Sequence, residues 1–133
     1  MTNAQTKLRA FSAVFTVRDV HRSLDYFVAQ LGFQEKFRLG DPISYASVER
    51  DAVSIHLKPP SRESDTVGRS GIYVLVTSVD GMQEELRARG CDIEVPPTDL
   101  FYGMREMALR DIDGNHITFG QHITPAGQPG QSV

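Results

Sequence analysis

The feature that most constrains the fold of this chain is a pattern that occurs twice. An apolar segment rich in β-branched residues is followed by one polar residue, then by apolar residues at helical spacing, and then by a glycine. This order occurs over residues 11–32 and again over residues 71–90. Asp19 and Ser78 hold the polar position, 59 residues apart, and either side chain can accept a hydrogen bond from the first turn of a helix. Because one helix cannot bury its apolar face alone, the pattern predicts two similar halves, each with its helix packed on a sheet.

Alternating segments after each helix predict the remaining strands. Residues 53–58 alternate cleanly between apolar and polar side chains, and residues 115–119 repeat that alternation in the second half. A short strand is also expected over residues 91–95. This order predicts an α+β fold made of paired βαβββ modules. The expected divisions are an N-terminal extension over 1–10, a first module over 11–60, a linker over 61–70, a second module over 71–122 and a flexible tail over 123–133.

Composition and charge exclude several classes of function. The formal net charge of −3 offers no basic surface for nucleic acid, and no apolar run reaches the roughly 20 residues that a membrane helix needs. Cys91 is the one cysteine, so no intrachain disulfide is possible, and residues 1–10 lack the apolar stretch of a signal peptide. These features lead us to expect a cytoplasmic protein in which Cys91 is a small buried residue.

Three segments resemble one known family. The segment "RDIDGNHITF" resembles the D-P-D-G-N ending of the glyoxalase/bleomycin-resistance/extradiol-dioxygenase group, also called the vicinal oxygen chelate superfamily, with Ile112 where proline is usual. The segment "FTVRDVHRSLDYFVAQLGF" is similar to that family's opening strand and helix, and "VTSVDGMQEEL" to the start of its second helix. The resemblance runs from about Phe11 to Gln121. It implies a curved mixed sheet that encloses a cavity, helices on the outer face, and a homodimer.

The same resemblance implies four positions at which metal-dependent members carry ligands. These positions fall on Ser12, His56, Gly71 and Thr118. Catalytic metal sites typically use about three protein ligands plus water, and neither a hydroxyl nor a glycine is a strong partner for a borderline-soft ion. With one competent ligand left, we expect no metal and no cofactor.

Strand alternation indicates which side chains line the cavity if His56 faces inward, because residues two apart share one face of a strand. The resulting mixture of aromatic, thioether, hydroxyl and carboxylate groups suits a small organic ligand. Glu106 is favoured for the cavity over a surface ion pair, whereas Arg105 points the opposite way and His116 is expected in solvent. The predicted ligand-binding residues are Ser12, Ser54, His56, Tyr73, Tyr102, Met104, Glu106 and Thr118.

Two classes of function fit these expectations. The first, which the missing metal ligands favour, is a protein that sequesters an antibiotic or metabolite in a metal-free cavity, similar to the bleomycin-resistance proteins. The second is an enzyme of the same superfamily, with His56 and Glu106 as the catalytic candidates. It would be a lyase or dioxygenase with unorthodox ligands such as His56, Glu106 and His116, or a metal-free isomerase that uses His56 and Glu106 as acid and base.

Overall fold

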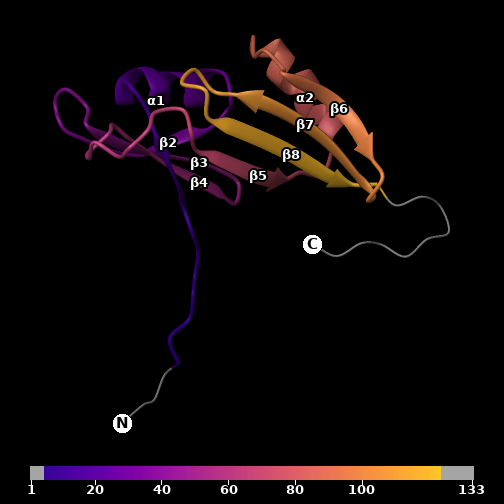
Figure 1. Ribbon diagram of the computed structural model, residues 1–133, viewed down its shortest axis with the longest axis horizontal. Coiled ribbons are helices and arrows are strands. Elements are labelled where there is room, and N and C mark those ends of the chain that lie inside the picture. The colour runs from indigo at the N-terminus through magenta and orange to yellow at the C-terminus, as the bar shows by residue number, and fades with distance from the viewer. Residues whose placement is uncertain (1–4, 124–133) are drawn as a thin grey trace.

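The chain folds into two similar modules, each a strand, a helix and three further strands. In the computed structural model, which describes residues 5–123, both helices lie on one side and the sheets on the other (Figure 1). The first module consists of β1 (Ala13–Thr16), α1 (Val20–Ala29), β2 (Gln34–Leu39), β3 (Tyr45–Arg50) and β4 (Val53–Lys58). The second consists of β5 (Gly71–Leu75), α2 (Val79–Ala88), β6 (Val95–Leu100), β7 (Met104–Arg110) and β8 (His116–His122).

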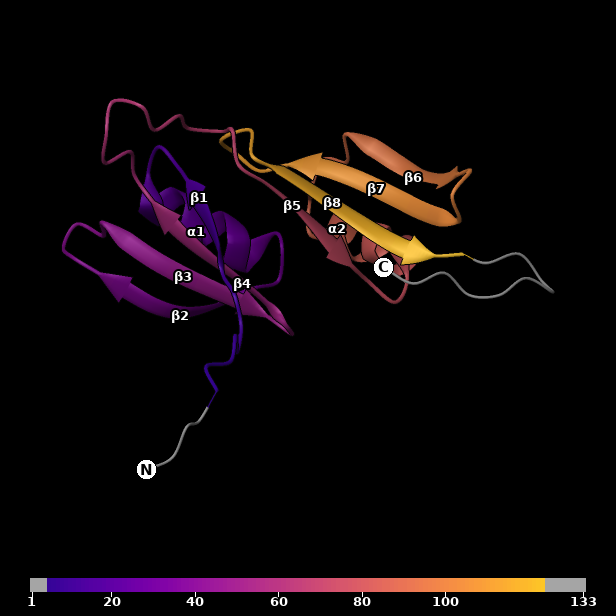
Figure 2. The same ribbon diagram turned by 60° about the horizontal axis from the view of Figure 1, so that its bottom comes forward.

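Each module forms one four-stranded mixed sheet, and the two sheets lie side by side (Figure 2). The first sheet has the order β1-β4-β3-β2 and the second has the order β5-β8-β7-β6. In both sheets the first strand pairs in parallel with the last strand of its module, and the other pairs are antiparallel. The predicted α+β fold of paired βαβββ modules is confirmed.

The two helices begin and end as the sequence predicts. The Asp19 carboxylate accepts a hydrogen bond from the backbone N–H of Arg22 at 3.1 Å, and the Ser78 hydroxyl accepts one from the backbone N–H of Gly81 at 2.9 Å. Each cap satisfies one of the free donors in the first helical turn. Gly32 follows α1 with φ 74°, a left-handed conformation that a residue without Cβ adopts at little cost.

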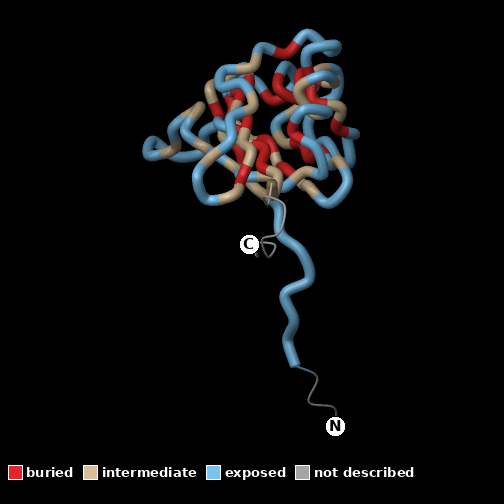
Figure 3. The backbone as a smooth tube through the Cα atoms, turned by 90° about the vertical axis from the view of Figure 1, so that its right-hand side faces the viewer, coloured by how far each residue is buried: buried red, intermediate tan, exposed pale blue. Residues whose placement is uncertain are grey.

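One continuous core joins the helices to the sheets. Phe27 of α1 and Leu86 of α2 are each 0% exposed, and both belong to the same cluster of buried side chains. Phe15, Ile55 and Leu57 enter this cluster from the first sheet, on the face that the helices cover. Buried residues accordingly run through the middle of the molecule (Figure 3). The opposite side of both sheets, which we call the open face, has no helix over it.

Contacts between the modules hold them together at several points. The Arg50 guanidinium on β3 donates two hydrogen bonds of 2.8 Å to the Glu85 carboxylate on α2, and a third, of 2.9 Å, to the backbone carbonyl of Leu31. The Arg89 guanidinium, at the end of α2, donates a hydrogen bond of 3.3 Å to the backbone carbonyl of Ala29 at the end of α1. The guanidinium beside Glu85 lowers the pKa of that carboxyl. Charge and backbone contacts thus support the shared core.

The strand predicted over residues 91–95 is wrong in its position. The strand after α2 is β6, which begins at Val95 and continues through two prolines to Leu100. Proline is tolerated there because β6 is an edge strand, and the pairing with β7 is irregular between Val95 and Thr98. Cys91 is buried, and its N–H donates to the carbonyl of Leu86 at 2.9 Å, which ties it to the end of α2 instead.

Some predicted divisions lie partly outside the described residues. They are residues 1–4 of the expected N-terminal extension and residues 124–133 of the expected tail. Residues 5–12 form no helix or strand, and they run away from the two sheets (Figure 1).

Candidate ligand-binding face

The open face of the first sheet carries a tyrosine–histidine pair. The Tyr45 hydroxyl lies 2.8 Å from Nδ1 of His56, and the two rings meet edge to face with centroids 5.6 Å apart. Tyr45 comes from β3 and His56 from β4, and the register places Ser47 directly beside His56. Because residues two apart share a face, Tyr45, Ser47 and His56 all point away from the helices. The imidazole is therefore oriented by a neutral partner.

Hydroxyl and apolar groups surround this pair. The Ser12 and Ser54 hydroxyls are 2.8 Å apart, which joins the segment before β1 to β4. Phe37 on β2 lies edge to face with Tyr45, with ring centroids 6.5 Å apart, and is 49% exposed. Val14, next to His56 in the register, is 48% exposed. The open face of the first sheet thus combines uncharged polar groups with apolar ones.

The second sheet carries a different cluster, centred on a carboxylate. Oε2 of Glu106 accepts a hydrogen bond from the Tyr73 hydroxyl at 2.7 Å and another from the Tyr102 hydroxyl at 3.1 Å. Tyr73 comes from β5 and Glu106 from β7, whereas Tyr102 lies in the turn between β6 and β7. Three separate segments therefore meet at one carboxylate oxygen.

Gly120 makes the contact between Tyr73 and Glu106 possible. The register places Tyr73 beside Thr118 on β8 and Glu106 beside Gly120, so the Tyr73 ring must cross β8 to reach the carboxylate. A Cβ added at Gly120 would overlap the Tyr73 hydroxyl oxygen. The missing side chain at this position is what lets the phenol lie across the strand.

The two phenols on Glu106 stay protonated over a wide pH range. Partial burial, together with the hydrogen bond to the carboxylate, raises the pKa of Tyr73 to about 12. The same two causes raise the pKa of Tyr102. A neighbouring negative charge disfavours the phenolate, so both hydroxyls remain donors at neutral pH.

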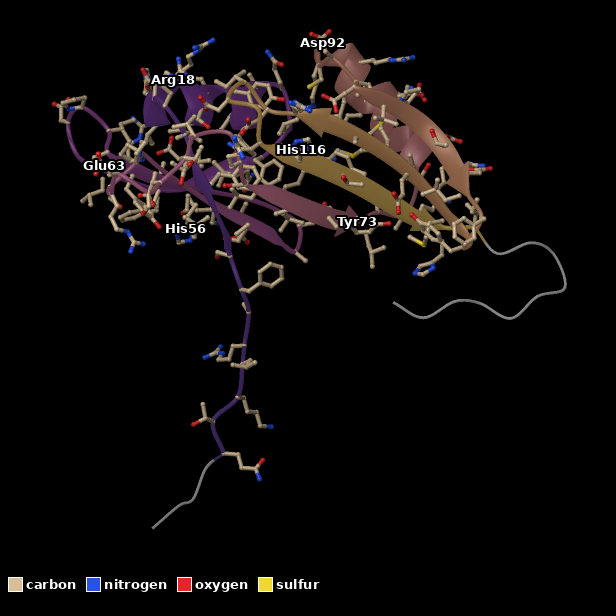
Figure 4. The ribbon with its side chains drawn as sticks, viewed as in Figure 1. Arg18, His56, Glu63, Tyr73, Asp92 and His116 are labelled. Carbon is tan, nitrogen blue, oxygen red and sulfur yellow. The ribbon has the colours of Figure 1, made fainter. Side chains whose placement is uncertain are left out.

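All eight predicted ligand-binding residues lie on or beside the open face, but not in one place. Ser12, Ser54 and His56 belong to the first sheet. The second sheet holds Tyr73, Tyr102, Met104, Glu106 and Thr118, of which Met104 is buried without joining the main core. Figure 4 shows His56 and Tyr73 well separated along the side away from the helices.

Sequence reasoning missed Tyr45 and Phe37, and it gave Gly120 no role. Tyr45 and Ser47 alternate with the fully buried Ala46 and with Val48, so period-two spacing in β3 was a usable signal for Tyr45. Phe37 gave none, because every residue of β2 is exposed and the strand has an irregular register between Glu35 and Phe37. Gly120 is recognisable only after Tyr73 has been placed.

Arg105 points to the helix side, opposite Glu106. Its guanidinium donates to the Asp99 carboxylate at 2.6 Å and to the Asp80 carboxylate of α2 at 3.0 Å. The hydrogen bond from Arg105 lowers the pKa of Asp99. Arg105 thus links α2 to the β6–β7 hairpin and takes no part in the open face. His116 is exposed.

A cavity of about 520 Å³ lies at the junction of the modules, away from the predicted residues. Phe33, Val53, Ile72 and Met82 contribute to its apolar lining, and the Arg50–Glu85 pair lies at its border. None of the eight predicted ligand-binding residues lines it.

The donors at the four family ligand positions do not fit a divalent metal. Ser12 and Thr118 offer only hydroxyls, of which that of Ser12 is hydrogen-bonded to Ser54, and Gly71 has no side chain, so the His56 imidazole is the one strong ligand among the four. Within residues 5–123, no three His, Cys, Asp or Glu side chains come together as a potential metal site. The unorthodox set of His56, Glu106 and His116 is therefore not assembled in one chain.

Comparison with known proteins identifies the family. Residues 9–119 match the model of the Glyoxalase/Bleomycin resistance protein/Dioxygenase superfamily. This chain belongs to that superfamily. The resemblance in the "RDIDGNHITF" and "LGF" segments is thereby confirmed. Among proteins of curated function, none matches the sequence significantly.

Solved superfamily structures share this fold while differing in what they bind or do. The bleomycin-binding protein of bleomycin-producing Streptomyces verticillus, solved with copper(II)-bleomycin, is 25% identical, with a TM-score of 0.72 over 91% of this chain and 100% of that chain. TnmS3, an antibiotic binding protein from Streptomyces sp. CB03234, is 21% identical, with a TM-score of 0.74 over 90% and 99%. The lactoylglutathione lyase of Agrobacterium tumefaciens is 15% identical, with a TM-score of 0.71 over 88% and 96%.

Neither described helix is long and apolar enough to cross a membrane.

Proposed function

We propose that this protein binds a small organic molecule, an antibiotic or a metabolite, on the open face and does not transform it. The observation that carries the proposal is the make-up of that face. Its polar side chains form two tyrosine-centred clusters set among half-exposed apolar residues, which suits a ligand with an apolar body and a few polar groups. Superfamily relatives that bind bleomycin and another antibiotic support it. A cytoplasmic location, expected from the sequence, stays part of the proposal.

We propose that binding needs no metal. The donor set at the family positions supports this, because only His56 offers a strong ligand there and catalytic metal sites typically use about three protein ligands. Metal analysis of protein purified without chelator is the direct check. Stoichiometric zinc, nickel, iron or manganese would contradict the metal-free site.

We further propose that the binding cavity is completed by a second copy of the chain. Four apolar side chains of the open face, Val14, Phe37, Tyr73 and Leu75, are 48–49% exposed in one copy, and a sheet from a partner would cover them. Light scattering should give twice the mass of one chain. Phe37→Glu should shift the protein toward the monomer, because it places a charge in the covered face.

The enzyme alternative has weaker support in the geometry. An acid–base pair must act on the same reacting group, whereas His56 and Glu106 lie on different sheets of one chain and each is hydrogen-bonded to its own tyrosine. The lyase among the structural relatives shares the fold at 15% identity, which carries no role for these residues. Turnover is therefore an outcome to be tested.

The test combines a binding screen with a search for product. Bleomycin and a panel of other natural-product antibiotics are scored for a rise in Tm, and each stabilising compound is incubated with the protein and followed by mass spectrometry. The proposal expects a bound compound that is recovered unchanged. A product that accumulates with time only in the presence of protein would establish the enzyme alternative.

A histidine variant locates the binding face. His56→Ala removes the imidazole beside Tyr45. It is expected to weaken binding of the compound found in the screen about tenfold, which corresponds to the loss of roughly one good hydrogen bond. The matched control is His21→Ala on the exposed side of α1, where Nε2 of the ring lies 3.7 Å from an Asp25 carboxylate oxygen. Equal affinity in the two variants would remove His56 from the site.

A further inference from the structure

We propose that the Tyr73–Glu106–Tyr102 cluster is a receptor for a primary ammonium group carried on an apolar or aromatic body. This inference rests on the proposed function, since it names the chemical class of ligand that the open face takes. In this arrangement the second sheet binds the charged end of the ligand, and the first sheet binds the uncharged remainder.

The hydrogen bonds of Glu106 leave acceptors free. Both phenols donate to Oε2, at 2.7 and 3.1 Å, and no described side chain donates to Oε1. Each phenol oxygen keeps lone pairs after donating its proton. Oε1 and the two phenol oxygens are therefore three acceptors grouped at one carboxylate, and a primary ammonium presents three donors.

The negative charge of Glu106 has no cation beside it. Arg105 and Lys58 are committed to carboxylates elsewhere, and none of the ion pairs within residues 5–123 includes Glu106. The two phenols cannot neutralise the carboxylate, because the raised pKa values of Tyr73 and Tyr102 keep their protons on oxygen. Covering this face with a second copy would enclose a charge that needs a partner, and a ligand cation supplies one.

The surroundings of the cluster select an organic cation over a metal ion or an anion. The rings of Tyr73 and Tyr102, both partly exposed, flank the carboxylate, and Leu75 is exposed on the same strand and face as Tyr73. Aromatic rings attract organic cations and pack against apolar carbon. One carboxylate with two protonated phenols is a poor metal site, and it repels anions.

The tyrosines provide a reporter for the test. The chain has four tyrosines and no tryptophan. Tyr45 reports on the first sheet, Tyr73 and Tyr102 report on the second, and the buried Tyr26 in α1 serves as an internal reference. Protein labelled with ¹³C in its tyrosine rings therefore gives four assignable sets of signals that distinguish the sites.

Four probes that share a phenethyl or similar body are titrated into the labelled full chain. They are phenethylamine, its trimethylammonium analogue, 2-phenylethanol and 3-phenylpropionate. Phenethylamine is expected to shift the Tyr73 and Tyr102 signals in a saturable way, about tenfold more tightly than either 2-phenylethanol or the trimethylammonium analogue, because only it combines charge with three donors. The Tyr26 signals should not move.

Glu106→Gln keeps the shape of the side chain and removes its charge. In this variant phenethylamine should bind no better than 2-phenylethanol, while unchanged Tyr26 and Tyr45 signals establish that the variant is folded. Glu49→Gln on the first sheet, also an exposed strand carboxylate, is the matched control and should keep the tenfold preference.

The outcomes separate this inference from the proposed function. The ammonium site is overturned if phenethylamine and 2-phenylethanol bind with equal affinity, or if the preference for the amine survives Glu106→Gln. In either case, shifts of the Tyr45 signals with one of these probes still support binding on the open face. Equal affinity for the trimethylammonium analogue overturns the three-acceptor arrangement. If no probe and no antibiotic moves any of the three reporter tyrosines, both the ammonium site and the proposed function fail.

Discussion

The two sheets carry the same kind of cluster on their open faces but with opposite electrical character. On the first sheet the tyrosine hydroxyl meets the His56 imidazole, and the neighbouring polar groups are serines. On the second sheet two tyrosine hydroxyls meet the Glu106 carboxylate. The two halves therefore share one scaffold and carry chemically distinct groups on its open face.

The helix sides of the two sheets have not diverged in the same way. Phe27 and Leu86 hold similar positions in α1 and α2, and both are completely buried in one core. Substitution on that side changes packing volume, which a dense interior tolerates poorly. Most side chains of the open face are less tightly packed, so the two halves can carry different chemical groups there.

The largest effect is expected from truncation of the shared core. Phe27→Ala should lower the free energy of unfolding by about 3–5 kcal/mol, and Leu86→Ala by about 2–5 kcal/mol, because each leaves a cavity under a sheet. Urea unfolding followed by circular dichroism measures both. Since the core is continuous, each variant should still unfold in a single transition. Two separate transitions would show that the modules are independent units.

The next effect concerns the ionisation of Tyr73. In Gly120→Ala the added Cβ displaces the phenol from Glu106, so the pKa of Tyr73 should fall from about 12 toward its ordinary value of 10.0. Glu106→Gln should lower it part of the way, because burial remains. The ¹³C signals of the Tyr73 ring, followed as a function of pH, detect the change. A Tyr73 pKa that stays near 12 in both variants would contradict the cluster.

A smaller, pH-dependent effect is expected at the contact between the modules. Arg50 lowers the folded-state pKa of Glu85, so its contribution to stability is complete above the unfolded value of 4.5 and is lost as pH falls through the folded value. Because Glu85 is partly exposed, Glu85→Gln should cost about 1 kcal/mol at pH 7. The cost should shrink toward pH 3. The exposed neighbour Glu84→Gln is the control and should cost much less at either pH.

The smallest effect sharpens the contrast between the sheets. Tyr45→Phe removes the hydroxyl that contacts His56. It should weaken the binding of phenethylamine and of 2-phenylethanol by the same factor, about threefold, so the ratio of the two affinities stays unchanged. Glu106→Gln should instead change this ratio, because it removes the preference for the amine over the alcohol. Both ratios come from the tyrosine titrations already described. A changed ratio in Tyr45→Phe would mean that the two clusters bind the charged group together.

Particular residues explain how far sequence reasoning reached. Asp19, Ser78 and the two glycines predicted both helices, because capping is a local interaction between neighbours. Alternation placed Ser54, His56 and Glu106 on the open face for the same reason. The strand after α2 was misplaced, because Pro96 and Pro97 are permitted only by the edge position of β6, which local sequence does not reveal.

The sequence by itself determined the family, the two modules and the side of each strand, since these depend on spacing along one segment. Tertiary structure alone decided which side chains meet. Tyr45 reaches His56 through the β3–β4 register, and Tyr73 reaches Glu106 because Gly120 leaves room above β8. Such contacts join residues 11 to 33 positions apart. They arise from strand pairing and from the space left by a third residue, which no single stretch of sequence encodes.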